Sequence, residues 1–285
     1  MIFIHEDYRR LFKGYTLDDF FSVDGEVFKE IQNRRTVRFV RGGEAFFVKA
    51  HRGTGWKEIF KNLLFLRPPV LSAKNEWEAI RKIHSAGLST MQAVGYGEEG
   101  FNPAGKCSFL LTRSLENTAS LEQWARTDFP EIPAGARRTR CKRALLYRVA
   151  RIASTMHEAG INHRDFYLCH LRLDMSRGDV CEQADCVPVY IMDLHRAQIR
   201  TKTPVRWVAK DLAGLMFSAI DGPASISLST RDLARFIKAY TGLSLRLAID
   251  RHSDLWRAVV RRYSRDFYRQ YGCQPGLAPF LREAL

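Results

Sequence analysis

Two aspartates, each set behind an apolar segment, are the residues of this chain best suited to chemistry. Asp165 follows the segment that ends at Ile161, and Asp193 closes the apolar run Val189 to Met192. One carboxylate can orient or deprotonate a hydroxyl group, and a second can hold a divalent cation. Both are requirements of phosphoryl transfer, which also needs a cation on the phosphate groups.

Lys49 is the candidate for that phosphate-binding cation, because it ends the apolar strand Phe46 to Val48. In phosphoryl-transfer sites of this type, a carboxylate from a neighbouring helix holds the lysine in place. Glu76 and Glu78 stand on either side of Trp77 in a predicted helix. We choose Glu76 as the partner, and the spacing keeps Glu78 as the alternative.

The segment from His163 to His170 has the spacing of a kinase catalytic loop, H-R-D-x-x-x-x-N. In this layout Asp165 is the catalytic residue, while His163 and Arg164 support the loop. His170 stands where an asparagine would bind the second metal ion. Two roles are open for its imidazole: a ligand of Mg²⁺, which prefers oxygen donors, or a hydrogen-bond partner within the loop.

Two more features follow from this layout. Asp193 lies where kinases hold a bridging Mg²⁺, and Asp211 resembles the aspartate that supports the catalytic loop from a later helix. The short interval between them argues against a long activation loop and hence against a signalling protein kinase. A Gly-rich phosphate loop is missing before Lys49, and Arg34 or Arg35 is the candidate for phosphate contact in its place.

The elements predicted around these residues form two lobes. Short strands dominate up to residue 112, and helices dominate from Leu121 onward. We therefore predict an α+β, bilobal, protein-kinase-like fold. Its small β-rich N-lobe (residues 1–112) serves the nucleotide phosphates, and its larger α-rich C-lobe (113–285) carries the catalytic loop, the metal site and acceptor binding. The predicted strands are 26–31, 36–40, 45–49, 90–97 and 107–112, and the predicted helices are 75–85, 142–159, 232–240 and 254–271.

Composition restricts the partners and the compartment. The 45 Lys and Arg residues exceed the 31 Asp and Glu residues, and the net charge of +14 indicates an anionic partner. No nucleic-acid-binding motif accompanies this charge. The first residues show neither the basic nor the apolar region of a signal peptide, and no apolar run reaches transmembrane length, so we expect a cytoplasmic protein. The six cysteines are scattered, and we expect neither a disulfide nor a zinc site at Cys181 and Cys186.

Several stretches between about residue 25 and residue 240 resemble bacterial lipopolysaccharide core heptose(I) kinases. The run from Asp193 to Gln198, Asp-Leu-His-Arg-Ala-Gln, is far more specific than a general kinase motif. The family has a cysteine where Phe166 stands, and the segment 174–186 and the last 40 residues match poorly. The resembling stretches are 34–39, 47–53, 58–64, 69–71, 75–80, 160–165 and 191–198.

The resemblance implies phosphorylation, dependent on ATP and Mg²⁺, of O-4 on the first heptose of the lipopolysaccharide inner core. That acceptor is attached to lipid A and faces the cytoplasm, which implies a peripheral protein at the inner membrane of a Gram-negative bacterium. Carried over to this chain, Asp165 is catalytic, Lys49 with Glu76 binds ATP, and Asp193 binds metal. The family is also linked to acyl carrier protein, an acidic partner that suits a basic surface.

Two further segments each have two interpretations. Five basic residues follow Asp193 closely, and they either bind the phosphates and acidic sugars of the acceptor or form a solvated basic face: Arg196, Arg200, Lys202, Arg206 and Lys210. The segment 56–67 has apolar residues at helical spacing beside Lys and Arg. It is either a helix lying in the membrane interface or a helix facing the core.

The alternatives come from two classes. One is another sugar or small-molecule kinase of the same fold, acting on a second heptose or on Kdo, which the run from Asp193 to Gln198 disfavours. The other is a catalytically inactive pseudokinase that serves as a binding protein, suggested by His170 and the missing Gly-rich loop. The joint presence of Lys49, Asp165 and Asp193 argues against it.

Overall fold

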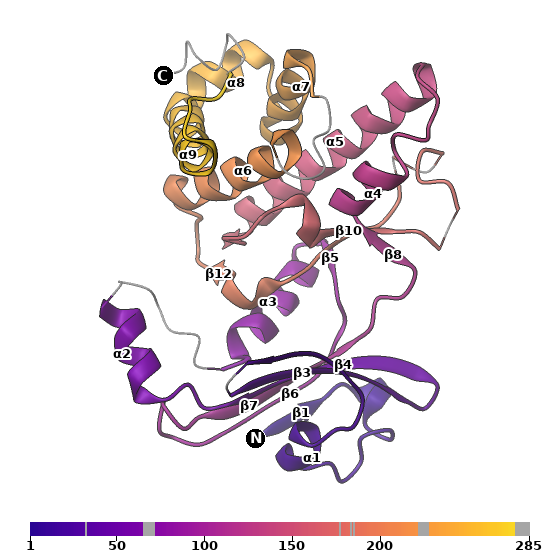
Figure 1. Ribbon diagram of the computed structural model, residues 1–285, viewed down its shortest axis with the longest axis vertical. Coiled ribbons are helices and arrows are strands. Elements are labelled where there is room, and N and C mark those ends of the chain that lie inside the picture. Colours follow the sequence, from indigo (N-terminus) through magenta and orange to yellow (C-terminus); the bar gives the residue numbers. More distant parts are fainter. Residues whose placement is uncertain are drawn as a thin grey trace. The chain divides into compact units, whose positions relative to one another are not determined.

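The computed structural model describes residues 1–31, 33–64, 72–176, 178–182, 184, 186–221 and 228–276. The chain divides into two compact units (Figure 1). The first unit comprises Met1–His84, Thr90–Glu116 and Asp193–Ala197. The second comprises Ser85–Ser89, Asn117–Met192 and Gln198–Leu285.

A six-stranded antiparallel sheet in the order β1-β6-β7-β4-β3-β2 forms the centre of the first unit. The predicted strands are confirmed within it, except that the run predicted over 90–97 is the two-residue β5 (Ser89–Thr90) followed by β6. The strand β1 was not predicted, because three apolar residues show no alternation. The strands are β1 (Ile2–Ile4), β2 (Glu26–Ile31), β3 (Arg34–Arg41), β4 (Glu44–Arg52), β6 (Ala93–Glu99) and β7 (Cys107–Arg113).

Strand β4 separates the core of the first unit from its polar face. Successive side chains of a strand point to opposite sides, so Phe46, Val48 and Ala50 enter the aromatic core while Lys49 and His51 face away from it. The helix α1 (Leu17–Phe21) and the 3₁₀ turn η1 (Glu6–Tyr8) contribute to that core. Its buried aromatic members are Tyr8, Phe12, Phe20, Phe21, Phe39, Phe46 and Phe109.

Helix α3 (Lys74–Ser85) packs by the apolar side that its sequence predicts. Trp77, Ile80 and Ile83 are buried, at the three-residue steps of one helix face. Gly87 follows with φ +73°, a conformation that ends helices. Helix α2 (Trp56–Leu64) precedes it, and part of the predicted helical segment 56–67, together with 69–71, lies outside the described residues.

The second unit is built mainly of helices. Helix α5 begins at Ala136 and not at the predicted residue 142, because its first turns are polar and the apolar spacing only starts at Cys141. The predicted ranges also did not include α4, α6 or α8, although Asp211 was assigned to a later helix. The helices are α4 (Leu121–Thr127), α5 (Ala136–Glu158), α6 (Val205–Ile220), α7 (Thr230–Thr241), α8 (Leu245–Arg251) and α9 (Ser253–Tyr271).

Short strands frame the loop that carries Asp165. β10 (Leu171–Asp174) pairs with β11 (Val189–Ile191) and with β8 (Thr118–Ser120), and β9 (Ile161–Asn162) pairs with β12 (Gln198–Ile199). The 3₁₀ turn η2 (Leu168–His170) lies between β9 and β10. The backbone on both sides of the loop is therefore held in ladders.

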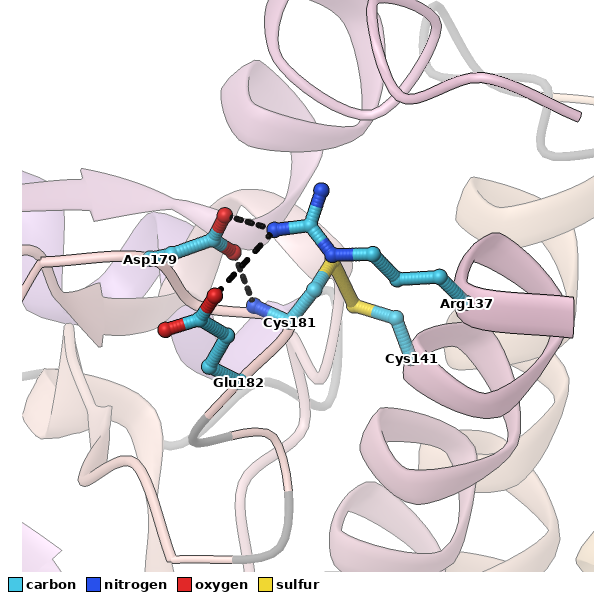
Figure 2. The surroundings of a disulfide bond; sticks show 5 residues. All are labelled: Arg137, Cys141, Asp179, Cys181 and Glu182. Atoms are coloured by element: carbon cyan, nitrogen blue, oxygen red, sulfur yellow. Dashed lines mark hydrogen bonds and ion pairs between the residues drawn. A yellow bond between two sulfur atoms is a disulfide. The ribbon is translucent and has the colours of Figure 1, made fainter.

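A disulfide joins Cys141 of α5 to Cys181, with 4.8 Å between their Cα atoms (Figure 2). The sequence-based expectation that Cys181 forms no disulfide is wrong. Its partner is 40 residues away, a pairing that only the fold reveals. Beside it, the guanidinium of Arg137 pairs with Asp179 and lies 3.8 Å from Glu182 (Figure 2). Together these contacts tie the segment between β10 and β11 to the start of α5.

An apolar cavity of about 130 Å³ lies among the helices of the second unit. Leu145, Leu212 and Ile237, from α5, α6 and α7, are among its lining residues. Lys142, also in the lining, has its Nζ 2.7 Å from Oδ2 of the buried Asp232. Burial would raise the pKa of Asp232, but Lys142 and Ser229 bring it down to about 2.

Within the described residues, no helix has both the length and the apolar character that a bilayer crossing needs.

Candidate active site

The first unit holds Lys49 by a buried carboxylate. Nζ of Lys49 donates a hydrogen bond of 2.6 Å to Oε1 of Glu76, whose side chain is 3% exposed. Glu78, the alternative partner, has its carboxylate 3.8 Å from Lys74 instead. Burial would lower the pKa of Lys49, but the carboxylates of Glu76 and Asp193 raise it above its ordinary value. The lysine therefore stays charged.

Asp193 begins the 3₁₀ turn η3 (Leu194–Arg196) in the left-handed conformation, with φ +59°. Its Oδ1 lies beside Nδ1 of His195. The side-chain amide of Asn75, at the start of α3, donates to the carbonyl oxygens of His195 and Ala197, at 2.9 Å each. Asn75 thus holds the turn that follows Asp193, and it does so from the same helix that supplies Glu76.

His51 is a member of this face that the sequence reasoning missed. It stands two residues after Lys49 on β4, and the strand register pairs it with Arg34. Burial, Arg34, Lys49 and His195 lower its pKa to about 4, so the imidazole is neutral at pH 7. The period of two along β4 was the available signal, since Lys49 and His51 must share a face.

Of the two arginines proposed in place of the Gly-rich loop, Arg35 makes structural contacts. Arg34 and Arg35 both lie on β3, near the turn between β2 and β3. The guanidinium of Arg35 donates to the carbonyl oxygens of Phe21 and Val23, at 3.3 Å each. Arg35 therefore anchors the sheet to the segment after α1. Gln32, which follows Ile31 in the sequence, lies outside the described residues.

In the second unit, Asp211 of α6 holds the backbone at the start of the loop 163–170, hereafter the Asp165 loop. Its fully buried carboxylate accepts from the backbone N–H of His163 at 2.6 Å and of Arg164 at 2.7 Å. Nε2 of His157 lies 3.4 Å from the same carboxylate. Arg164 has φ +75°, which a residue with a Cβ adopts only when its surroundings impose it.

The two histidines of the Asp165 loop fix its course. Nε2 of the buried His163 lies 2.7 Å from the carbonyl oxygen of Met192, the residue before Asp193. Nδ1 of His170 lies 2.7 Å from the carbonyl oxygen of Asp165, and the two imidazole rings stack. One nitrogen of His170 is therefore used within the loop.

Three arginines lie around the indole ring of Trp207 in α6. The guanidinium carbons of Arg164, Arg200 and Arg206 lie 5.2, 5.8 and 5.5 Å from the centre of its indole ring. Arg200 is further fixed by hydrogen bonds to the side-chain oxygens of Asn162, at 2.6 Å, and of Gln198, at 2.8 Å. Arg196, which the sequence analysis grouped with Arg200 and Arg206, belongs to η3 in the first unit.

Phosphoryl transfer needs a cation for the phosphates and carboxylates for the acceptor and the metal. The chain has a charged lysine held by a buried glutamate, an aspartate in a rigid loop after a helix, and a further aspartate after strand β11. The α+β fold that carries them is that of the protein-kinase-like phosphotransferases.

Comparison with known proteins defines the family. The model of the lipopolysaccharide kinase (Kdo/WaaP) family matches residues 18–240, and the chain belongs to this family. A lipopolysaccharide core heptose(I) kinase WaaP from Pseudomonas aeruginosa is 43% identical over 94% of this chain and 96% of its own length. The protein of the same name from Escherichia coli K12 is 44% identical over 82% and 84%.

A solved structure has the same fold. The structure described as WaaP in complex with acyl carrier protein matches 93% of this chain and 98% of its own, with a TM-score of 0.76 and 38% identity. The family membership and the protein-kinase-like fold that the sequence suggested are confirmed. The chain is a phosphotransferase that acts on a sugar hydroxyl group.

Proposed function

We propose that this protein uses ATP to phosphorylate O-4 of the first heptose in the lipopolysaccharide inner core. The observation that carries the proposal is its similarity, over most of both chains, to curated proteins named as core heptose(I) kinases. The family model also names Kdo, so a Kdo sugar is the second candidate acceptor. The charged pair of Lys49 and Glu76 favours a working kinase over an inactive binding protein.

The proposed chemistry assigns one task to each charged group. Lys49, held by Glu76, binds the phosphates of ATP. Asp165 orients the acceptor hydroxyl and receives its proton as the new phosphate ester forms. Asp193 would hold Mg²⁺, because its carboxylate is the hard oxygen donor that this ion prefers, and the ion would supply positive charge on the phosphate oxygens.

His170 has two proposed roles that can be separated by experiment. As a second metal ligand it would offer only Nε2, because Nδ1 is bonded to the carbonyl of Asp165. A His170→Asn variant that needs more Mg²⁺ for half-maximal rate would assign it to the metal. A variant with unchanged Mg²⁺ dependence and lower thermal stability would assign it to the loop.

We propose that the arginines around Trp207 receive the acidic groups of the acceptor. Guanidinium groups form paired hydrogen bonds with phosphate and carboxylate oxygens. Arg200 and Arg206 supply two such groups next to the Asp165 loop, and Arg196 is the third proposed contact. Arg206→Ala should raise the KM for the acceptor and leave the KM for ATP unchanged.

The function is tested by incubating the protein with ATP, Mg²⁺ and dephosphorylated, heptose-bearing core lipopolysaccharide. Phosphate on the sugar is followed with labelled ATP, and its position is assigned by NMR. We expect transfer to O-4 by the wild type and none by Asp165→Ala. No transfer by the wild type, or undiminished transfer by Asp165→Ala, would refute the proposal.

We also propose acyl carrier protein as a partner. A similar solved structure contains this carrier, the carrier is acidic while this chain has a charge of +14, and the second unit holds an apolar cavity suited to an acyl chain. Ala219→Trp would fill this cavity, since Ala219 is part of its lining. The variant should weaken binding of acyl-loaded carrier and leave binding of the unloaded carrier unchanged.

For localisation we propose the cytoplasmic face of the inner membrane, with α2 as the contact. Trp56, Phe60 and Leu64 recur at four-residue steps and are 50%, 63% and 81% exposed, whereas Ile59 is buried. Phe60→Asp should reduce co-sedimentation with vesicles of anionic phospholipid, and unchanged co-sedimentation would refute the contact.

A further inference from the structure

Lys210 is a cation beside Asp165 that no kinase motif identifies. It precedes Asp211 in α6, and its Nζ donates a short hydrogen bond to the carbonyl oxygen of Arg164. The same Nζ lies 3.8 Å from Oδ1 of Asp165. The side chains of Lys210 and Asp165 are only 15% and 16% exposed. The ammonium group is therefore held in one place next to the carboxylate.

The elements around Lys210 make this position rigid. Asp211 binds the backbone of residues 163 and 164, which locks α6 to the start of the Asp165 loop. Further along α6, Gly214 lets the loop approach closely, since a Cβ there would lie 3.1 Å from the ring of Tyr167. Lys210 thus lies on a helix that contacts the loop at two points, Asp211 and Gly214.

The part of the loop that follows Asp165 supplies no such charge. Between Asp165 and His170 the chain reads Phe-Tyr-Leu-Cys, without lysine or arginine. A phosphoryl group in transfer carries negative charge on its three equatorial oxygens and lies next to the acceptor oxygen. An acceptor hydroxyl hydrogen-bonded to Asp165 would stand about 3 Å from that carboxylate. A cation adjoining the carboxylate is therefore within reach of the transferring group.

We propose that Lys210 is a catalytic residue whose ammonium group stabilises the phosphoryl group during transfer. The bond between the γ-phosphorus and the β–γ bridging oxygen breaks, and the bond between phosphorus and the acceptor oxygen forms. The hydroxyl proton passes to Asp165, and ADP leaves with the bonding electrons. Lys210 keeps its proton throughout and acts by charge. The inference rests on the proposed phosphotransferase function and deepens it.

A purely structural role is the competing explanation. Arg164 has the left-handed backbone conformation, and in this explanation Lys210 serves only as a hydrogen-bond donor to its carbonyl oxygen. A neutral amide donor would do this equally well, whereas stabilising a phosphoryl group requires a positive charge. Lys210→Gln and Lys210→Arg therefore separate the two roles.

The test compares these variants, in the full chain, with the wild type and with Lys238→Met, which removes an exposed lysine of α7. We expect Lys210→Gln to lower kcat about 10²- to 10³-fold, the usual effect of losing one stabilising donor. We expect the KM for ATP to change less than about threefold and Lys210→Arg to recover at least about tenfold in kcat. Lys238→Met should behave as wild type.

Two results would overturn the inference: a Lys210→Gln enzyme within about threefold of the wild-type kcat, or a loss confined to the KM for the acceptor. The same proteins are compared in ATP hydrolysis with water as the acceptor. This second assay decides the role of Lys210 even if heptose is not phosphorylated. Failure of the heptose assay alone would count against the proposed function and not against Lys210.

Discussion

At the residue scale, the charged state of Lys49 depends on one carboxylate. Lys49 faces away from the aromatic core because its neighbours Val48 and Ala50 face into it, and it is charged there because Glu76 offsets the cost of burial. The strand alternation was readable in the sequence. The choice between Glu76 and Glu78 was not, because both flank the buried Trp77.

The two glutamates provide a matched pair of variants. Glu76→Gln leaves Lys49 without its compensating charge, so we expect kcat/KM for ATP to fall on the order of 10²-fold, or ~3 kcal/mol. Glu78→Gln removes an exposed carboxylate and should change it less than about twofold. Equal losses in the two variants would show that Glu76 has no special role.

His51 predicts a pH dependence of stability. Its pKa is about 4 in the folded protein, below its ordinary value, so the unfolded chain binds a proton at a pH where the folded chain does not. Stability is therefore full above about pH 6.5 and falls as the pH drops towards 4, by up to ~3 kcal/mol. Urea unfolding at several pH values should show a smaller drop for His51→Gln. Identical pH profiles would contradict the assignment.

At the element scale, periodicity predicted the strands and helices whose apolar residues repeat. Helices α3, α7 and α9 and strands β2 to β4 begin and end close to the predicted residues. The first turns of α5 were missed because they are polar, and β1, α4 and α8 because they are short. For α6 the sequence analysis predicted a helix at Asp211 but no bounds. Contacts that join distant elements, such as Asn75 with the turn after Asp193, leave no period in the sequence and could not be predicted.

Asp211 joins α6 to the Asp165 loop, and its loss should affect both stability and activity. Asp211→Ala leaves the buried backbone N–H of His163 and the partly buried N–H of Arg164 without their acceptor. We expect a loss of about 2–5 kcal/mol in the free energy of unfolding, with a large drop in kcat. Asp250→Ala, which removes an exposed aspartate of α8, is the control. Wild-type stability in Asp211→Ala would contradict this account.

The disulfide between α5 and the segment before β11 makes a prediction about thiols. Cys107, Cys169, Cys186 and Cys273 are the unpaired cysteines, so the unreduced, denatured protein should show four thiols and the reduced protein six. Opening a loop of 40 residues should lower the stability of the second unit by ~4 kcal/mol in the loop-entropy model. Six thiols without reductant would contradict the bond.

In the cytoplasm, where thiols are normally kept reduced, the same two cysteines would be a dithiol. Thermal unfolding with and without reductant measures the difference between the two states. The variant Cys141→Ser should unfold like the reduced wild type, and its stability should no longer respond to reductant.

At the scale of the whole molecule, the two units carry different parts of the proposed chemistry. Lys49, Glu76 and Asp193 belong to the first, and Asp165, Lys210 and Asp211 belong to the second. The bilobal, protein-kinase-like class was predictable because its motifs are spaced along the sequence in a fixed order. The sugar acceptor was indicated only by the resemblance to heptose kinases, because no motif of general phosphoryl-transfer chemistry specifies a sugar.

We claim that the acceptor is heptose. The most direct measurement compares phosphate transfer from ATP to two purified acceptors, a core that ends in Kdo and the same core extended by its first heptose. We predict transfer to the heptose-bearing core alone, abolished by Asp165→Ala. Equal phosphorylation of the core that ends in Kdo would contradict the claim.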